Sequence, residues 1–197
     1  MKLLFCLAWR KKLNILLLSN YRKGEAMKAI IVYYSLTSNT EFVAKEISSR
    51  LNCDILPLEV LNPYPDKGFK KFYWGGKSAV MKESPELKKY TFNKNDYDVI
   101  IFGTPVWAGT FTPPLRTFVK ENDLSDKNIV IFACSSGGKA TNAINKLKDE
   151  IGIKSDILSL ELVDPKNKYN EKIEKQIDDF IEEIKKVYNW RDVLGVI

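Results

Sequence analysis

The chain has 197 residues, of which 45% are hydrophobic and 28% charged, which is usual for a globular protein with a single core. It contains no histidine, which excludes Ser-His-Asp and Cys-His catalysis and every metal site that needs an imidazole. The three cysteines, Cys6, Cys53 and Cys134, form no C-x-x-C pair, which argues against a disulfide framework or a zinc site and favours the reducing cytoplasm.

The first 26 residues carry most of the net charge of +6. They contain six basic residues and one acidic residue, whereas the rest of the chain is almost neutral, with 25 basic and 24 acidic side chains. The body therefore does not have the charge of a nucleic-acid-binding protein. The two apolar runs of this extension are split by basic residues at 10–12 and lack a signal-peptide cleavage site, and no run in the chain approaches the ~20 apolar residues of a membrane span. Residues 22–26 resemble a ribosome-binding site read as protein, so we expect translation to start at Met27.

Strands and helices alternate from residue 28 onward. Short apolar runs predict strands at 28–35, 53–60, 97–107, 128–136 and 155–163. Apolar residues spaced by three or four predict helices at 38–51, 113–122, 139–152 and 170–189. The segment 62–96 is less regular, and we expect a turn followed by a broken helix within 68–90.

This alternation predicts an α/β protein with a doubly wound open parallel sheet of five strands and helices on both faces. We expect one domain at 27–189, with 1–26 as an N-terminal extension and 190–197 as a C-terminal tail. Ligands of such sheets bind beyond the carboxyl ends of the strands, so the loops after the first, third and fourth strands are the candidates for a site.

The loop after the first strand, SLTSNT at 35–40, is rich in hydroxyl groups and contains no lysine or arginine. It precedes a helix, whose N-terminal N–H groups and dipole favour an anion. A terminal phosphate, bound by dipoles and hydrogen bonds alone, suits this loop. The alternative is simple capping, with Thr37 or Ser38 as the N-cap and Glu41 completing a capping box.

The loop after the third strand, GTPVWAGTFTPPL at 103–115, places Trp107 between the strand end and a flexible Ala-Gly pair. A flat aromatic beside flexible backbone suits stacking on a planar ring, and Gly109 lets the backbone approach that ring. The alternative is that Trp107 covers an edge of the core.

The loop after the fourth strand, ACSSGGKAT at 133–141, offers unhindered backbone N–H groups around Gly137 and Gly138. Taken alone it is more typical of a tight turn before a helix. All three loops nevertheless fall at the same end of the predicted sheet, and their coincidence is more specific than any one of them.

The segments VYYSLTSNTEFVA, DYDVIIFGTPVWAGTFTPPLRTFV and IVIFACSSGG resemble the flavodoxin-like family of FMN proteins. The resemblance covers residues 28–188 and implies the strand order 2-1-3-4-5 and a non-covalent FMN. It implies that the phosphate is bound by Ser35, Thr37, Ser38, Asn39 and Thr40, that the flavin ring is lined by Thr104, Pro105, Val106, Trp107, Ala108 and Gly109, and that its pyrimidine side is closed by Ser135, Ser136, Gly137 and Gly138.

The sequence departs from classical electron-carrier flavodoxins in two respects. Its body is near neutral where theirs is acidic, and the loop after the fourth strand has no second aromatic to cover the flavin. One face of the flavin ring is then either open, where it could accept a hydride or a small quinone, or covered by Tyr73 or Trp74.

The resemblance implies a cytoplasmic redox protein that carries electrons between partner proteins and contains no catalytic residue or metal. The alternative is a small FMN-dependent reductase that oxidises NAD(P)H and reduces a quinone. A receiver-like signalling domain is disfavoured, because the ends of the first and third strands lack the acidic residues that such domains need to bind magnesium.

Overall fold

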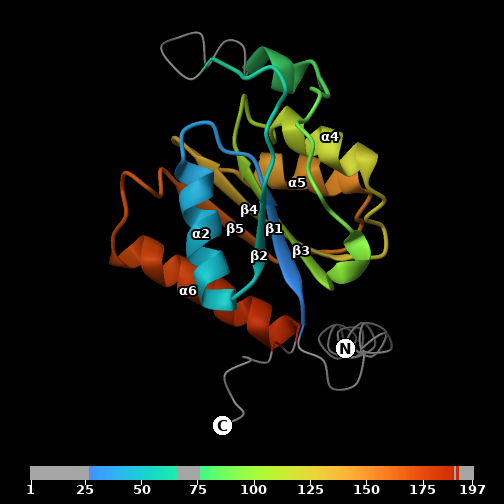
Figure 1. Ribbon diagram of the computed structural model, residues 1–197. Coiled ribbons are helices and arrows are strands. Elements are labelled where there is room, and N and C mark those ends of the chain that lie inside the picture. Colours follow the sequence, from blue (N-terminus) through green and yellow to red (C-terminus); the bar gives the residue numbers. More distant parts are fainter. Residues whose placement is uncertain (1–26, 66–75, 189, 191–197) are drawn as a thin grey trace, which may run out of the picture.

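The computed structural model describes residues 27–65, 76–188 and 190, and these form a five-stranded parallel sheet in the order β2-β1-β3-β4-β5 (Figure 1). The predicted doubly wound sheet and its strand order are therefore confirmed. The strands are β1 (Ala29–Tyr33), β2 (Asp54–Pro57), β3 (Val99–Pro105), β4 (Asn128–Ser135) and β5 (Ser159–Val163). The helices are α2 (Asn39–Leu51), α4 (Pro113–Glu121), α5 (Thr141–Ile151) and α6 (Glu171–Val187), with a 3-10 turn η2 (Lys94–Asp96) before β3.

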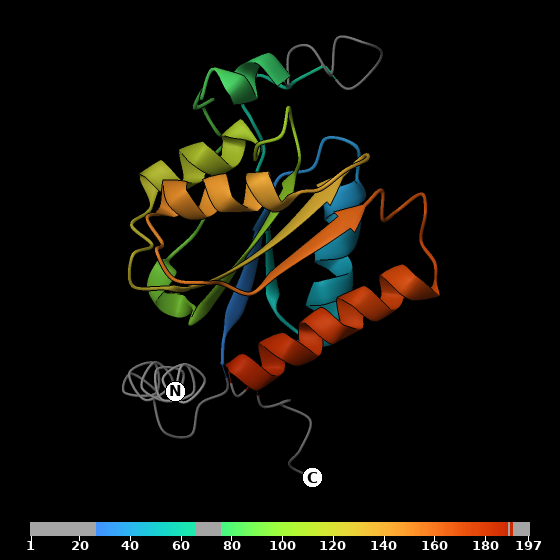
Figure 2. The same cartoon turned by 180° about the vertical axis from the view of Figure 1, so that it is seen from behind.

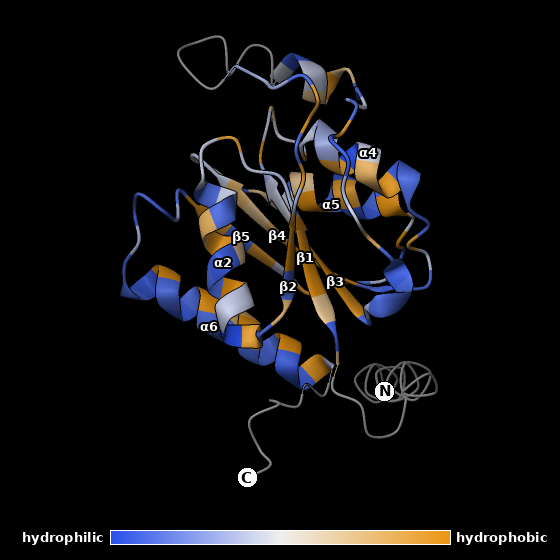
Figure 3. Ribbon diagram, in the orientation of Figure 1, coloured by the Kyte–Doolittle hydropathy of each residue, from blue (hydrophilic) through white to orange (hydrophobic). Residues whose placement is uncertain are grey.

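Helices cover both faces of the sheet. α2 and α6 pack on one face, and α4 and α5 pack on the other (Figures 1 and 2). Successive strand residues point to opposite faces, so Ile31 and Ile101 enter the first core layer while Ile30 and Ile100 enter the second. Figure 3 shows the consequence, an apolar sheet between helices whose outer surfaces are hydrophilic. Trp190, from the predicted tail, also packs against the first layer.

The centre of the sheet is closely packed around Gly103 in β3. A Cβ atom at this position would lie 2.4 Å from Cζ of Phe132 and 2.9 Å from Cβ of Tyr33. Contacts this short do not occur between real side chains, so the neighbouring strands can lie against β3 only because residue 103 is glycine. This packing fixes the position of the loop that follows β3.

The segment between β2 and β3 leaves the sheet and returns. Val60 and Leu87 form an isolated antiparallel bridge, and the N–H of Leu61 donates to the carbonyl of Glu86 at 2.8 Å. Residues 76–80 are helical, which agrees with part of the predicted broken helix, and lie beyond the carboxyl ends of the strands (Figure 1). Tyr73 and Trp74, the predicted cover of the flavin, lie outside the described residues.

No helix in the part of the chain that the structure describes is long and apolar enough to cross a membrane.

Candidate functional site

The switch point of the sheet lies between β1 and β3. The chain leaves β1 toward α2 on one face and leaves β3 toward α4 on the other, and both strands end at the same edge. Open α/β sheets bind ligands in the crevice that this divergence creates. The hydroxyl-rich loop at 35–40 and the Trp107 loop therefore both begin at this edge of the sheet, on either side of the switch point.

Two hydroxyl groups of the first loop are buried without a partner. Thr40 is 1% exposed, and its Oγ1 atom has no nitrogen or oxygen partner among the described residues; its neighbour is the thiol of Cys134, which is only a weak hydrogen-bonding group. The buried Oγ atom of Ser35 has no partner among the described residues either. Buried polar atoms are almost always hydrogen-bonded, and an unsatisfied one costs about 1–3 kcal/mol. The folded chain thus keeps one unused hydroxyl in the loop after β1 and another in the first turn of α2, and a ligand with oxygen atoms would satisfy them.

The capping alternative is not what the structure shows. Ser38 occupies the N-cap position of α2, but with a φ of 63°, and its side chain accepts no hydrogen bond from a backbone N–H of the first turn. Glu41 pairs with Lys45 at 2.6 Å, and this hydrogen bond is the main reason that the pKa of Glu41 is lowered, with further contributions from Ser38 and Lys166. Because no side chain caps this helix, its first turn keeps the partial positive charge that attracts an anion.

Asn39 and Thr37 differ from these hydroxyl residues. The side chain of Asn39 is bound by the loop after β5, through Asp164 and the backbone of Lys166. Thr37 is exposed at the surface of the loop.

The Trp107 loop closes as a tight two-residue turn. The N–H and C=O groups of Trp107 and Thr110 bond to one another reciprocally, both at 2.9 Å, with φ angles of 47° at Ala108 and 69° at Gly109. A type I′ turn needs positive φ at both central residues, which glycine adopts freely and alanine at a cost of about 1–2 kcal/mol. The side chain of Asn142 in α5 donates to the Gly109 carbonyl at 2.6 Å and fixes the turn.

Trp107 belongs to a cluster of three aromatic rings. Its ring lies edge-to-face with Tyr34 at 5.6 Å and with Tyr64 at 5.1 Å between centroids, and the two tyrosines contact each other at 6.3 Å. The hydroxyls of Tyr64 and Ser78 lie 2.9 Å apart, which ties the cluster to the helical segment 76–80. Burial raises the pKa of Tyr34, so this phenol stays neutral. The cluster forms an apolar wall at the switch point.

Thr104 and Ser135 hold the loops together with their side chains. The Thr104 hydroxyl accepts from the N–H of Thr112 at 3.1 Å and donates to the Pro105 carbonyl at 2.9 Å, deep in the protein. The Ser135 hydroxyl donates to the Gly138 carbonyl at 2.8 Å. The hydroxyls of Thr104 and Ser135 are thus already hydrogen-bonded within the protein, and only the backbone groups of these two residues remain for a ligand.

The remaining predicted site residues also lie at the carboxyl-end edge of the sheet. Pro105 ends β3, paired with Cys134, and the N–H of Val106 donates to the Cys134 carbonyl at 2.9 Å. Ser136, Gly137 and Gly138 are exposed after β4, as unhindered backbone donors should be.

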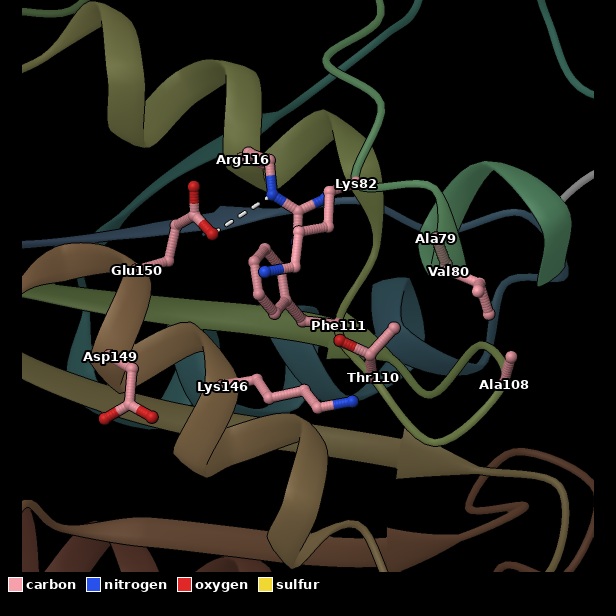
Figure 4. Close-up of a pocket in the computed structure, with 10 residues that line it drawn as sticks. All are labelled: Ala79, Val80, Lys82, Ala108, Thr110, Phe111, Arg116, Lys146, Asp149 and Glu150. Atoms are coloured by element: carbon pink, nitrogen blue, oxygen red, sulfur yellow. Dashed lines mark hydrogen bonds and ion pairs between the residues drawn. The ribbon is translucent and has the colours of Figure 1, made fainter.

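A cavity of about 400 Å³ lies on the other side of the Trp107 turn, between α4, α5 and residues 79–82 (Figure 4). Of the predicted site residues only Ala108 lines it, so it is separate from the hydroxyl loop. Arg116 is buried in its wall, where Nε pairs with Glu150 at 3.1 Å and the guanidinium lies 4.6 Å from the Phe111 ring centroid. Lys82, Lys146 and Asp149 also line it, so its charged lining is mixed.

Sequence reasoning missed Tyr64 and the loop after β5. Tyr64 lies in a Pro-rich turn with no periodicity, so nothing in the local sequence shows that its ring reaches Trp107. β5 ends at the same edge of the sheet as the other strands, so the parallel topology alone indicated that the loop after β5 belongs among the candidate binding loops.

Comparisons with known proteins agree with this geometry. The family model described as flavodoxin matches residues 28–183. A flavoprotein structure from Bacteroides eggerthii DSM 20697 is 22% identical with a TM-score of 0.64, covering 83% of this chain and 99% of that one. A flavoprotein from Lactobacillus acidophilus NCFM, in complex with FMN, is 21% identical with a TM-score of 0.60, covering 72% of this chain and 97% of that one. None of the curated proteins searched matches the chain. At these identities the solved structures show the fold alone.

Proposed function

Because the chain belongs to the flavodoxin family, we propose that it binds FMN non-covalently and carries electrons between partner proteins. The observation that carries this proposal is the pair of buried hydroxyls without partners, Ser35 Oγ in the loop before α2 and Thr40 Oγ1 in its uncapped first turn. A phosphate offers the acceptor atoms that both hydroxyls lack, and it carries the charge that the helix dipole favours. The solved flavoprotein from Lactobacillus acidophilus, which has the same fold, contains FMN.

The residues that would hold the cofactor form three groups, each next to a different part of FMN. The hydroxyls of Ser35, Thr37, Ser38 and Thr40 would hold the phosphate, with Asn39 beside them. The flavin ring would lie along the turn from Thr104 to Gly109, with Trp107 as its aromatic neighbour, and the backbone of Ser135–Gly138 would close its pyrimidine side. The bound flavin supplies the redox chemistry, while these residues orient it and exclude water from it.

The test begins with the spectrum of the purified protein. We expect a yellow protein that releases FMN on denaturation, and an apoprotein that binds added FMN with quenching of its fluorescence. Trp107→Ala should change the fluorescence and potentials of the bound flavin more than its affinity, because stacking is lost while the phosphate contacts remain. An apoprotein that binds no flavin would refute the proposal.

The second candidate function is an FMN-dependent NAD(P)H:quinone-type reductase. The cavity beside the Trp107 turn favours it, since a reductase needs room for a second molecule next to the flavin and an electron carrier does not. Lys82 and Lys146 would suit an anionic group of that molecule. Steady-state oxidation of NAD(P)H by the purified protein, with a quinone as acceptor, would favour the reductase, whereas reduction only by a partner protein would favour the carrier.

We further propose that residues 27–189 form the flavin domain and that the protein works in the cytoplasm. The thiols of Cys53 and Cys134 are free, which supports a reducing compartment. Residues 1–26 lie outside the described part of the chain, and the intact mass of the native protein would test whether translation starts at Met27.

A further inference from the structure

The side chain of Asn39 is held by the loop between β5 and α6. Its Nδ2 atom donates to Oδ1 of Asp164 at 3.1 Å, and its Oδ1 atom accepts from the backbone N–H of Lys166 at 3.0 Å. Both ends of the amide are therefore used by residues far away in the sequence. Asn39 connects the hydroxyl loop to the loop after β5.

Asp164 is the centre of this connection. Its Oδ1 atom also accepts from Nδ2 of Asn167 at 2.8 Å, and its backbone N–H donates to the carbonyl of Ser135 at 2.8 Å. Its φ of 48° lies in the left-handed region, which aspartate tolerates better than most residues. One residue thus joins the start of α2, the end of β4 and the β5–α6 loop.

This connection brings a lysine to the hydroxyl loop, which has no basic residue of its own. The backbone of Lys166 is fixed beside Asn39, and its ammonium group contributes to the lowered pKa of Glu41 in the first turn of α2. Lys166 makes no ion pair within 4 Å to a carboxylate of the described residues. Its charge therefore lies near the start of α2, where the hydroxyls of Ser35 and Thr40 have no partner.

We propose that the first part of the β5–α6 loop, residues 164–166, forms the outer wall of the phosphate site and that Lys166 supplies its positive charge. Asn39 and Asp164 are positioning residues, because they act by holding the backbone of Lys166 in place. The inference rests on the proposed binding of FMN. A charged lysine at the phosphate differs from the prediction made from sequence, in which the phosphate is bound by dipoles and hydrogen bonds alone.

The first test compares FMN with riboflavin, which has the same ring and no phosphate. In a fluorescence titration of the apoprotein at low salt, Lys166→Gln should raise the Kd of FMN by roughly 3- to 10-fold, since an exposed ammonium is partly screened by water. The effect should shrink at 0.5 M NaCl, and the Kd of riboflavin should not change. Lys168→Gln, in the same exposed loop, is the matched control and should bind FMN like the wild type.

The second test concerns the hydrogen bonds of Asp164. Asp164→Ala removes the acceptor that holds Asn39, so it should weaken FMN binding without weakening riboflavin binding. Asp164→Asn keeps an acceptor oxygen at the same place and should restore FMN affinity to within about 2-fold of the wild type. If the asparagine variant is as weak as the alanine variant, the positioning role is overturned.

The outcomes separate this inference from the proposed function. A wild-type protein that binds FMN, together with a Lys166→Gln variant of equal affinity at low salt, overturns the role of Lys166 alone. A Lys166→Gln variant that loses FMN and riboflavin equally also overturns it, because the loss would not depend on the phosphate. A wild-type protein that binds neither flavin overturns both.

Discussion

Thr40→Val should stabilise the flavin-free protein and weaken its binding of FMN. Valine has nearly the shape of threonine and differs by a methyl group in place of the hydroxyl. Thr40 is 1% exposed and its Oγ1 atom has no nitrogen or oxygen partner among the described residues, so the substitution removes a buried polar atom that the fold leaves unsatisfied. The two effects have opposite signs, which is uncommon for a buried substitution.

The magnitudes follow from the state of this hydroxyl. Removing an unsatisfied buried hydroxyl recovers about 1–3 kcal/mol, and in a domain of this size 1 kcal/mol corresponds to about 2–4 °C, so Tm should rise by roughly 2–12 °C. A hydrogen bond to a charged phosphate contributes about 1.5–3 kcal/mol, so its loss should raise the Kd of FMN by about 10- to 150-fold.

The assay combines thermal denaturation of the apoprotein with a fluorescence titration by FMN. Thr117→Val is the matched control, because this threonine is also buried in a helix but its hydroxyl donates to the Pro85 carbonyl at 2.7 Å. The control should lower Tm, since it leaves the carbonyl without its partner, and should leave FMN affinity unchanged.

Two results would refute the reasoning. A fall in the Tm of the Thr40→Val apoprotein would show that the hydroxyl already has a favourable partner in the free protein, with the thiol of Cys134 beside it as the candidate. An unchanged Kd for FMN would show that the hydroxyl does not contact the phosphate.

Three further predictions concern stability. Gly103→Ala should cost about 1–3 kcal/mol, because the added Cβ atom would lie 2.4 Å from Cζ of Phe132, and a Tm equal to that of the wild type would contradict this packing. Ala108→Asn should raise stability by up to about 1 kcal/mol in thermal denaturation, because asparagine adopts the observed φ of 47° more readily than alanine does. The free energy of unfolding should fall between pH 9 and about 12. Burial raises the pKa of the Cys53 and Cys134 thiols from 9.0 to about 12, so the folded state retains protons that the unfolded state loses, and the stability present below pH 9 is lost as pH rises. Urea titrations at several pH values measure this slope, which should be flatter in a Cys53→Ala/Cys134→Ala variant.

The order of the elements could be read from the sequence because each depends on local pattern. Continuous apolar runs bounded by turn residues identified β1, β3 and β4, since a parallel strand is buried on both faces. The fifth strand was predicted from residue 155, but β5 begins at Ser159, because the apolar residue Ile157 packs against the core before the chain pairs with β4. Burial, which the apolar pattern reports, does not by itself require strand pairing.

The role of Asn39 could not be read from sequence. Its neighbours are hydroxyl residues, so the local pattern groups it with them as a phosphate ligand. In the folded protein its side-chain amide is hydrogen-bonded to Asp164 and to the backbone of Lys166. These residues lie beside Asn39 only because β5 ends at the same edge of the sheet as β1.

The sequence by itself determined that hydroxyls crowd the start of α2, that no lysine or arginine lies among them, and that strands and helices alternate. These properties depend on residues within a few positions of one another. Only the tertiary structure decided which hydroxyls of SLTSNT are left without partners, because satisfying a buried Oγ atom depends on the atoms that the folded chain brings next to it. The tertiary structure also decided that a loop from the far end of the chain brings a lysine to this segment.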